Sequence, residues 1–240
     1  MKIAVCIHGL YRAHVQPPPS ELNNRFKKLF PEADFYYHTW DGYSNDVPLQ
    51  YQLDDKHFFT DPEPILDYHP VNDSKTDCKH GKFKSYKDKN IMVNKTQNAN
   101  KQIIGYALMC KQITEPYDIM IRARWDTAID TKVDFTQYVE MAYNDGPVGF
   151  SSRSNRGPNG RDGTVEMIDK VNVDINDDWY GYLQDALIIH RRDHFDPDYV
   201  LQLHEEKNLW PCEWGWYQVL SLNHGDDFHT SFHGGAYLAR

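Results

Sequence analysis

The first forty residues predict a strand–helix–strand unit, and this limits the possible folds more than any other feature of the sequence. A continuous apolar run at Lys2–Ile7 leads into His8 and Gly9, as a buried strand that ends in a glycine turn would. Residues 20–30 place apolar side chains on one helical face, and residues 33–40 read as a second strand rich in aromatic residues. Such a unit implies a parallel pair of strands, so we predict an α/β fold with a mixed, mainly parallel sheet flanked by helices.

The remaining sequence continues this alternation of strands and helices. Apolar patterns predict strands at 117–124, 147–151 and 185–190, and helices at about 98–114, 198–207 and 214–222. Prolines and lysines interrupt the pattern at about 42–96, where we predict a loop-rich insertion with short elements. Glycines predict a loop at 152–163. A chain of 240 residues can bury one sizeable core, so we expect a single domain over residues 1–240.

Charge and cysteine content exclude several classes of protein. The formal net charge of −9 would repel a phosphate backbone, so we expect no nucleic-acid partner. No apolar run approaches the roughly 18 residues of a transmembrane segment. The four cysteines are scattered, as reduced thiols in a soluble cytoplasmic protein would be, and the histidine pair at 229 and 233 lacks the further ligands of a zinc site.

The most informative segment is Tyr117–Asp130, in which a strand ends in charged residues. Ligands of open parallel sheets bind beyond the carboxyl ends of the strands, and strand alternation places Arg122, Arg124 and Asp126 on one side. Two guanidinium groups beside a carboxylate could hold a diphosphate together with a divalent ion. A structural Arg–Asp ion pair at the end of the strand explains the same residues, and both interpretations stay open.

The ends of the first two strands carry further candidates. Gly9 would let the backbone approach a phosphate, and Arg12 could pair with a diphosphate, although an ordinary glycine turn with a surface arginine fits equally well. Trp40 could stack on a base and Asp41 could bind ribose hydroxyls, whereas a core position would also suit the tryptophan.

Five segments in this order resemble a group of GT-A-type glycosyltransferase-like proteins found in bacterial and viral polysaccharide loci. They are KIAVCIHGLYR, ADFYYHTWD, a helix leading to YDIMIRARWD, DALIIHRRDHF, and the segment at 210–214. The resemblance spans most of the chain outside 42–96. It implies a Rossmann-like nucleotide-sugar domain with a D-x-D-like metal site at the end of the IRARWD strand. Asp126 matches the last carboxylate of that site, but Arg124 stands where the first would be, so one carboxylate is left to hold the ion.

The resemblance implies an enzyme that transfers a sugar from a nucleoside diphosphate donor to a hydroxyl of a glycan or other acceptor, assisted by Mn²⁺ or Mg²⁺. Asp126 would bind the metal, joined by Asp130 if residues 126–130 form a turn. The predicted nucleotide-sugar site comprises His8, Gly9, Arg12, Thr39, Trp40, Asp41, Gln102, Arg122 and Arg124.

Two carboxylates are candidates for the base that deprotonates the acceptor hydroxyl. Asp185 opens a predicted strand, and Glu213 lies among tryptophans, where desolvation would raise its basicity. A glutamate that favours a helix N-terminus explains Glu213 as well. The missing first Asp of D-x-D also leaves open a non-catalytic nucleotide- or carbohydrate-binding module. In a third alternative, the aromatic residues of 210–217 form a subunit interface of a homo-oligomer.

Overall fold

The fold is described from a computed structural model of the chain. It describes residues 1–11, 18–42, 53, 57–66, 89–150, 166–169, 185–209, 212–221, 229–233 and 236–238. For residues 89–99, 166–169, 212–214, 221, 229–233 and 236–238, only the backbone is described.

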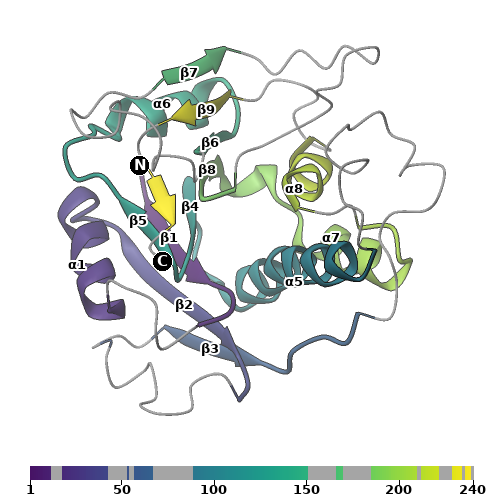
Figure 1. The fold of residues 1–240 in the computed structure, drawn as a ribbon. Helices are drawn as coiled ribbons and strands as arrows, with labels where there is room; N and C mark the ends of the chain where they lie inside the picture. The colour runs from purple at the N-terminus through teal and green to yellow at the C-terminus, as the bar shows by residue number, and fades with distance from the viewer. Residues whose placement is uncertain are drawn as a thin grey trace.

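An eight-stranded sheet forms the centre of the molecule, with the strands in the order β3-β2-β1-β4-β8-β6-β9-β7 (Figure 1). The neighbours β3, β2, β1 and β4 are parallel, β8 runs antiparallel to both β4 and β6, β9 is parallel to β6, and β7 is antiparallel to β9. The strands are β1 (Ile3–His8), β2 (Asp34–Trp40), β3 (Phe58–Asp61), β4 (Ile119–Arg124), β6 (Val148–Phe150), β7 (Glu166–Asp169), β8 (Leu187–Arg191) and β9 (His229–His233). The predicted fold class, a mixed and mainly parallel α/β sheet, is confirmed.

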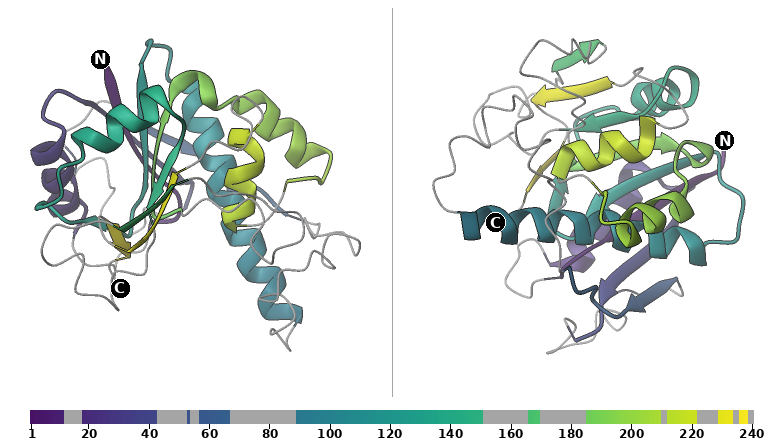
Figure 2. Two further views of the ribbon diagram at one scale, coloured as in Figure 1. Left: turned by 90° about the horizontal axis from the view of Figure 1, so that it is seen from above. Right: turned by 90° about the vertical axis from the view of Figure 1, so that its right-hand side faces the viewer.

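Helices cover both faces of this sheet (Figure 2). One face carries α1 (Pro19–Leu29) and α6 (Thr136–Asn144), and the other carries α5 (Lys89–Gln112), α7 (Pro197–Glu205) and α8 (Cys212–Ser221). A short 3₁₀ helix, η3 (Arg192–His194), follows β8, and β5 (Thr127–Ile129) pairs with β10 (Ala236–Leu238) in a small antiparallel sheet. None of the helices in the described ranges combines the length and the apolar character that a bilayer span requires.

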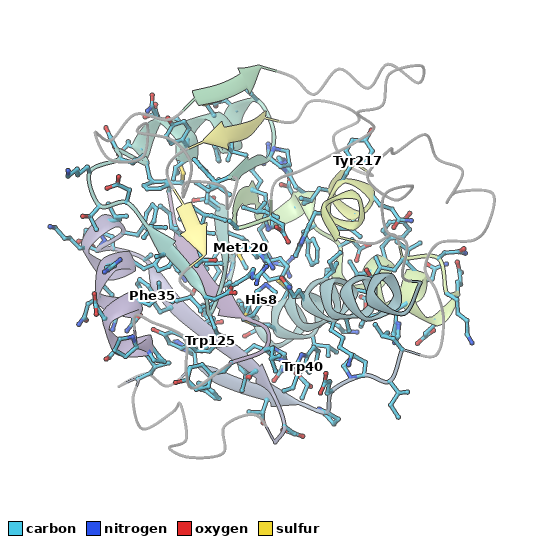
Figure 3. All side chains as sticks on the ribbon, in the orientation of Figure 1. His8, Phe35, Trp40, Met120, Trp125 and Tyr217 are labelled. Carbon is cyan, nitrogen blue, oxygen red and sulfur yellow. The ribbon has the colours of Figure 1, made fainter. Side chains whose placement is uncertain are left out.

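Strand alternation produces the two apolar cores between these layers. In β1, Ala4 and Cys6 belong to the core under α5, whereas Val5 and Ile7 belong to the core under α1 and α6. A strand that is buried on both faces needs apolar residues at successive positions, which explains the continuous apolar run at the start of the chain. The alternation also directs His8, at the end of β1, to the α5 side (Figure 3).

Element boundaries differ from the predicted ones at several points. The helix expected from about residue 98 already begins at Lys89. The prediction started too late because the first turns of α5 carry one consecutive apolar run, at 91–93, followed by polar residues, and so lack the apolar period of a helix. The stretch predicted as a loop-rich insertion with short elements contributes one such element, β3, whose four residues pair in parallel with β2. Ser20, the expected cap of the first helix, lies inside α1, which begins with Pro19 in its first turn. The predicted loop at 152–163 lies outside the described residues.

Candidate functional site

A pocket opens at the edge of the sheet where β1, β2 and β4 end, the edge at which the sequence predicted a ligand site. It encloses about 550 Å³, counting the part that is open to solvent. The strand ends contribute His8, Gly9, Leu10, Trp40, Arg124, Trp125 and Asp126. Helix α5 adds Lys101 and Gln102, and the segment after β3 adds Glu63. Figure 3 shows three of these side chains, His8, Trp40 and Trp125, around the ends of the strands.

A two-residue turn after β4 presents the charged part of this pocket. Thr127 fixes the turn, because its hydroxyl accepts from the backbone N–H of Arg124 at 3.1 Å and donates to the carbonyl of Ala186 at 2.7 Å. The indole N–H of Trp125 donates to the carbonyl of His38 at 2.8 Å. These bonds connect the turn to β2 and β8, so the residues on either side of Trp125 are held by buried contacts.

Arg124 and Asp126 form a bidentate ion pair across this turn. The Nε and Nη2 atoms of Arg124 donate to Oδ1 and Oδ2 of Asp126 at 2.7 and 2.6 Å. Their side chains are 20% and 18% exposed, so the pair is only partly screened by water. The segment thus contains both predicted features. Asp126 forms the structural ion pair with Arg124, and both residues also line an open pocket, as ligand-binding residues would.

Arg122 lies beneath the pocket and is completely buried. It donates through Nε to Nε2 of His8 at 2.7 Å, through Nη1 to the carbonyl of Asp185, and through Nη2 to Oε1 of Gln102 at 2.9 Å. The ring of Trp216 on α8 lies 4.5 Å from its guanidinium carbon. Burial lowers the pKa of Arg122 to about 10, against the opposing field of Asp185, so the group stays charged at neutral pH although uncharged atoms accept all three hydrogen bonds.

His8 is held in one tautomer by this contact. Because a guanidinium N–H can only donate, Nε2 of His8 must accept, and the ring hydrogen of a neutral imidazole then resides on Nδ1. Burial lowers the pKa of His8 well below its usual range, and the nearby Arg122 charge lowers it further, so the ring is neutral. Its Nδ1 atom is buried and has no hydrogen-bond partner among the described residues. His8, a residue that lines the pocket, thus carries a buried N–H donor that is not used within the described structure.

Close packing of α5 against the sheet shapes the floor of the pocket. A Cβ atom at Gly105 would lie 3.0 Å from the ring of Trp40 and 3.1 Å from that of His38, so a glycine permits this approach. Trp40 is 1% exposed and belongs to the core under α5, which favours the core interpretation of its ring. Gly9 has a φ of 102°, a conformation that glycine adopts without strain.

The pocket brings together six of the predicted nucleotide-sugar and metal residues: His8, Gly9, Trp40, Gln102, Arg124 and Asp126. Thr39 is buried and Asp41 is exposed, and neither lines it. Asp185 lies behind it, where its carbonyl oxygen contacts Arg122. Arg12 lies outside the described residues, and Glu213 is placed only by its backbone in the first turn of α8, one turn before Trp216.

Sequence reasoning missed a second ion pair in the pocket wall. Nζ of Lys101 lies 2.6 Å from Oε1 of Glu63, and both side chains are about one-quarter exposed, at 22% and 25%. Lys101 adjoins the predicted Gln102 on α5, and helical spacing alone gave no reason to select it. Glu63 follows β3, in the stretch that was predicted as loop-rich.

The donor set of the pocket does not fit a divalent cation well. Residues 127–129 form β5, so the turn that would bring Asp130 to Asp126 is absent, and Asp130 instead accepts from the backbone N–H of Lys132 at 2.9 Å. Both oxygens of Asp126 already bind Arg124, and a divalent ion beside that guanidinium would meet a repulsion of several kcal/mol. Across the described residues, no three His, Cys, Asp or Glu side chains gather as metal ligands would.

Comparison with known proteins yields matches of three-dimensional structure alone. No family model and no curated protein sequence matches the chain. TarS residues 1–349 from S. aureus, free and in complex with UDP-GlcNAc, match at 12% and 14% identity, each with a TM-score of 0.47 over all of this chain. The chain spans only 60% and 59% of those two structures.

Two further matches are similarly distant. A putative glucose-1-phosphate thymidylyltransferase from Bacillus anthracis matches at 12% identity and a TM-score of 0.48, covering 99% of this chain and 88% of that one. Mouse xyloside xylosyltransferase 1 matches at 10% identity and a TM-score of 0.37, covering 95% and 84%. The strand order and directions of the sheet themselves establish the α/β class that the resemblance to GT-A-type proteins implied.

Proposed function

We propose that this protein is a transferase that moves a sugar from a nucleoside diphosphate donor to a hydroxyl group of a glycan or similar acceptor. One observation carries the proposal. His8, Gly9, Gln102 and Arg124, selected from the sequence as donor-binding residues, line one pocket beyond the carboxyl ends of the parallel strands, together with Asp126, which was selected as a metal ligand. This edge is where open α/β sheets bind nucleotides.

The chemistry of the pocket suits such a donor. A sugar diphosphate offers anionic oxygens to guanidinium and ammonium groups, and hydroxyl groups to carboxylates and amides. Arg124 and Lys101 supply the cations, while Gln102 and Asp126 supply oxygens that accept hydrogen bonds. Stabilisation of the departing diphosphate would lower the barrier to transfer, because negative charge develops there in the transition state.

Asp185 and Glu213 are the proposed bases for the acceptor hydroxyl. Asp185 lies two residues before the start of β8, where its carbonyl accepts from Arg122. Glu213 lies one helical turn before Trp216, which packs on the same arginine. Removing a general base typically slows a reaction about 10²- to 10⁴-fold while the donor still binds. Asp185→Asn and Glu213→Gln would therefore each be compared with Asp193→Asn, an exposed carboxylate away from the pocket, for turnover and affinity separately.

A non-catalytic nucleotide- or carbohydrate-binding module is the second candidate. Its support is that both carboxylates lining the described pocket, Asp126 and Glu63, are ion-paired, to Arg124 and Lys101. Such a module would bind the donor and release no nucleoside diphosphate, either with acceptors or with water.

A panel of nucleoside diphosphate sugars, starting with UDP-GlcNAc, tests the proposal. A true donor should raise the unfolding midpoint, since a ligand at 100 times its Kd stabilises the folded state by about 2.7 kcal/mol, and should be split slowly to free nucleotide. Stabilisation without turnover would favour the module. If no nucleotide or nucleotide-sugar shifts the midpoint, the proposed function is wrong.

The proposed location of the protein is the cytoplasm, and its proposed assembly is a homo-oligomer. Cys6 and Cys110 are free, buried thiols, as is usual for a cytoplasmic protein. A homo-oligomer that uses the aromatic residues at 210–217 stays a prediction, which sedimentation of the purified chain would check.

A further inference from the structure

A divalent metal site needs carboxylates that are free to bind the ion, and the described carboxylates of this pocket are already paired with cations. Its two carboxylates are each neutralised by a cation, Asp126 by Arg124 and Glu63 by Lys101. Arg122 then adds a positive charge directly beneath, with a carbonyl, an amide oxygen and an imidazole nitrogen as its hydrogen-bond acceptors. The nearby carboxylates of Asp185 and Asp126 favour the charged form of Arg122, because they raise its pKa against the effect of burial. Because Arg124 and Lys101 already occupy both lining carboxylates, the described residues of the pocket offer a divalent cation no unpaired carboxylate.

Arg124 occupies the position at which a metal-binding carboxylate was expected. Its guanidinium group already binds both Asp126 oxygens, at 2.7 and 2.6 Å, and both residues line the pocket. A planar guanidinium group binds two oxygens of a phosphate in the same bidentate geometry that it uses for a carboxylate. A diphosphate could thus replace Asp126 on Arg124 by exchange of one bidentate partner for another.

His8 supplies a second donor for the same ligand. Its Nδ1–H is buried, lacks a partner among the described residues, and belongs to a ring that lines the pocket. Arg122 fixes the tautomer by occupying Nε2, so it acts as a positioning residue and does not itself reach the pocket wall. A buried donor without a partner is costly, and a phosphoryl oxygen would satisfy it.

We propose that the pocket binds the diphosphate of its donor without a divalent cation, through Arg124, His8 and Lys101, with Asp126 as an exchangeable partner that the diphosphate displaces from Arg124. This inference rests on the proposed function and specifies how the diphosphate is recognised. It assigns Asp126 a restraining role in place of a metal-binding one, and the two roles predict opposite effects of the same substitution.

The test measures binding of inorganic pyrophosphate and of UDP to the full chain by calorimetry, first with EDTA and then with Mn²⁺. The wild-type affinity should change by less than about twofold between the two conditions. Asp126→Asn keeps the shape of the side chain but weakens its hold on Arg124, so it should tighten binding a few-fold. Arg124→Met should weaken binding by roughly tenfold to a hundredfold, the usual loss for a charged hydrogen bond. Asp193→Asn, in an exposed pair of the same geometry, should change nothing.

Three outcomes would overturn the inference. Binding that strengthens more than about tenfold on addition of Mn²⁺, or that Asp126→Asn weakens, would restore the metal role and leave the proposed function in place. An Arg124→Met protein that folds normally and binds pyrophosphate as the wild type does would remove Arg124 from recognition. If neither probe binds in either condition, this inference fails together with the proposed function.

Discussion

The chain contains two Arg-x-Asp pairs of the same local geometry, and only one of them lines the pocket. Arg124 is the last residue of β4 and Arg191 is the last residue of β8, and the aspartate of each pair follows two residues later. In each pair Nε and Nη2 of the arginine donate to the two carboxylate oxygens. The side chains of the first pair are 20% and 18% exposed, and those of the second are 39% and 63% exposed.

Sheet topology explains this difference. Because β8 runs antiparallel to β4, the two strands end at opposite edges of the sheet. The end of β4 lies beside the ends of its parallel neighbours β1 and β2, whose residues complete the pocket. Arg191 instead extends over the exposed ring of Tyr143. An Arg–Asp pair is therefore a candidate site because of where its strand ends, and identical local chemistry elsewhere is an ordinary surface ion pair.

Replacement of Arg122, the buried arginine beneath the Arg124–Asp126 pair, should have the largest effect on the free energy of unfolding. Arg122→Met leaves His8, Gln102 and the Asp185 carbonyl without their buried donor, so we expect the free energy of unfolding to fall by about 3–5 kcal/mol. Arg191→Met should change it by less than about 0.5 kcal/mol. Urea denaturation of both variants checks this; equal losses would mean that the environments of the two pairs do not differ energetically.

The second test concerns helix α5, which packs closely against the sheet beside the pocket. Gly105→Val would force branched carbons against Trp40 and His38, at a cost of about 1–3 kcal/mol from overpacking. Gly105→Ala should cost less, because the neighbours need move by only a few tenths of an ångström and alanine gains up to about 1 kcal/mol in helix propensity. Unfolding midpoints would measure both, and a Val variant as stable as the wild type would contradict the close approach.

The third test separates the two nitrogens of His8. His8→Gln can still offer an acceptor to Arg122 but removes the Nδ1–H, so ligand affinity should fall about two- to tenfold with stability nearly unchanged. His8→Asn should lower the stability and leave the ligand affinity nearly unchanged, because its shorter amide keeps an N–H near the position of Nδ1 but does not reach Arg122. Imidazole ¹⁵N shifts of the wild type should show a protonated Nδ1 and a bare Nε2, and the opposite tautomer would contradict the assignment.

The smallest expected effect is the contribution of the exposed Arg191–Asp193 pair to stability. Burial raises the pKa of Asp193, but the hydrogen bonds and charge of Arg191 outweigh this, so the net pKa is lowered. Its contribution to stability is therefore present above the unfolded pKa of about 3.9 and disappears as the pH falls through the folded value. The free energy of unfolding, measured by urea denaturation, should be a few tenths of a kcal/mol higher for the wild type than for Arg191→Met at pH 6, and this difference should disappear near pH 2. A margin that grows on acidification would contradict this sign.

The sequence contained enough to predict the fold class and the edge of the sheet at which the pocket lies. Apolar runs at β1, β2, β4 and β8 are long, and the charged residues follow β4 directly, so strand position alone indicated Arg124 and Asp126. The first turns of α5 were missed, because the apolar run at 91–93 and the polar residues after it show no helical period. The position of β3 within the predicted insertion was not predicted, because a strand of four residues carries too short a pattern.

Pairing among side chains could not be predicted from the sequence. Arg122 and Arg124 look equivalent along the strand, yet one is enclosed by His8, Gln102 and Trp216 and the other reaches the pocket. The separation of Asp130 from Asp126 depends on β5 pairing with β10, a contact between segments about one hundred residues apart. Such long-range packing determines which of several charged residues can meet a ligand.

The most direct test of the central claim is a matched comparison of the two pairs in ligand binding. Arg124→Met and Arg191→Met would be titrated with UDP in the presence of EDTA, after their folding has been verified by circular dichroism. We predict that the first variant loses roughly tenfold to a hundredfold in affinity and that the second binds as the wild type does. Equal affinities for the two variants would contradict the claim that the pocket at the end of β4 recognises a diphosphate through Arg124.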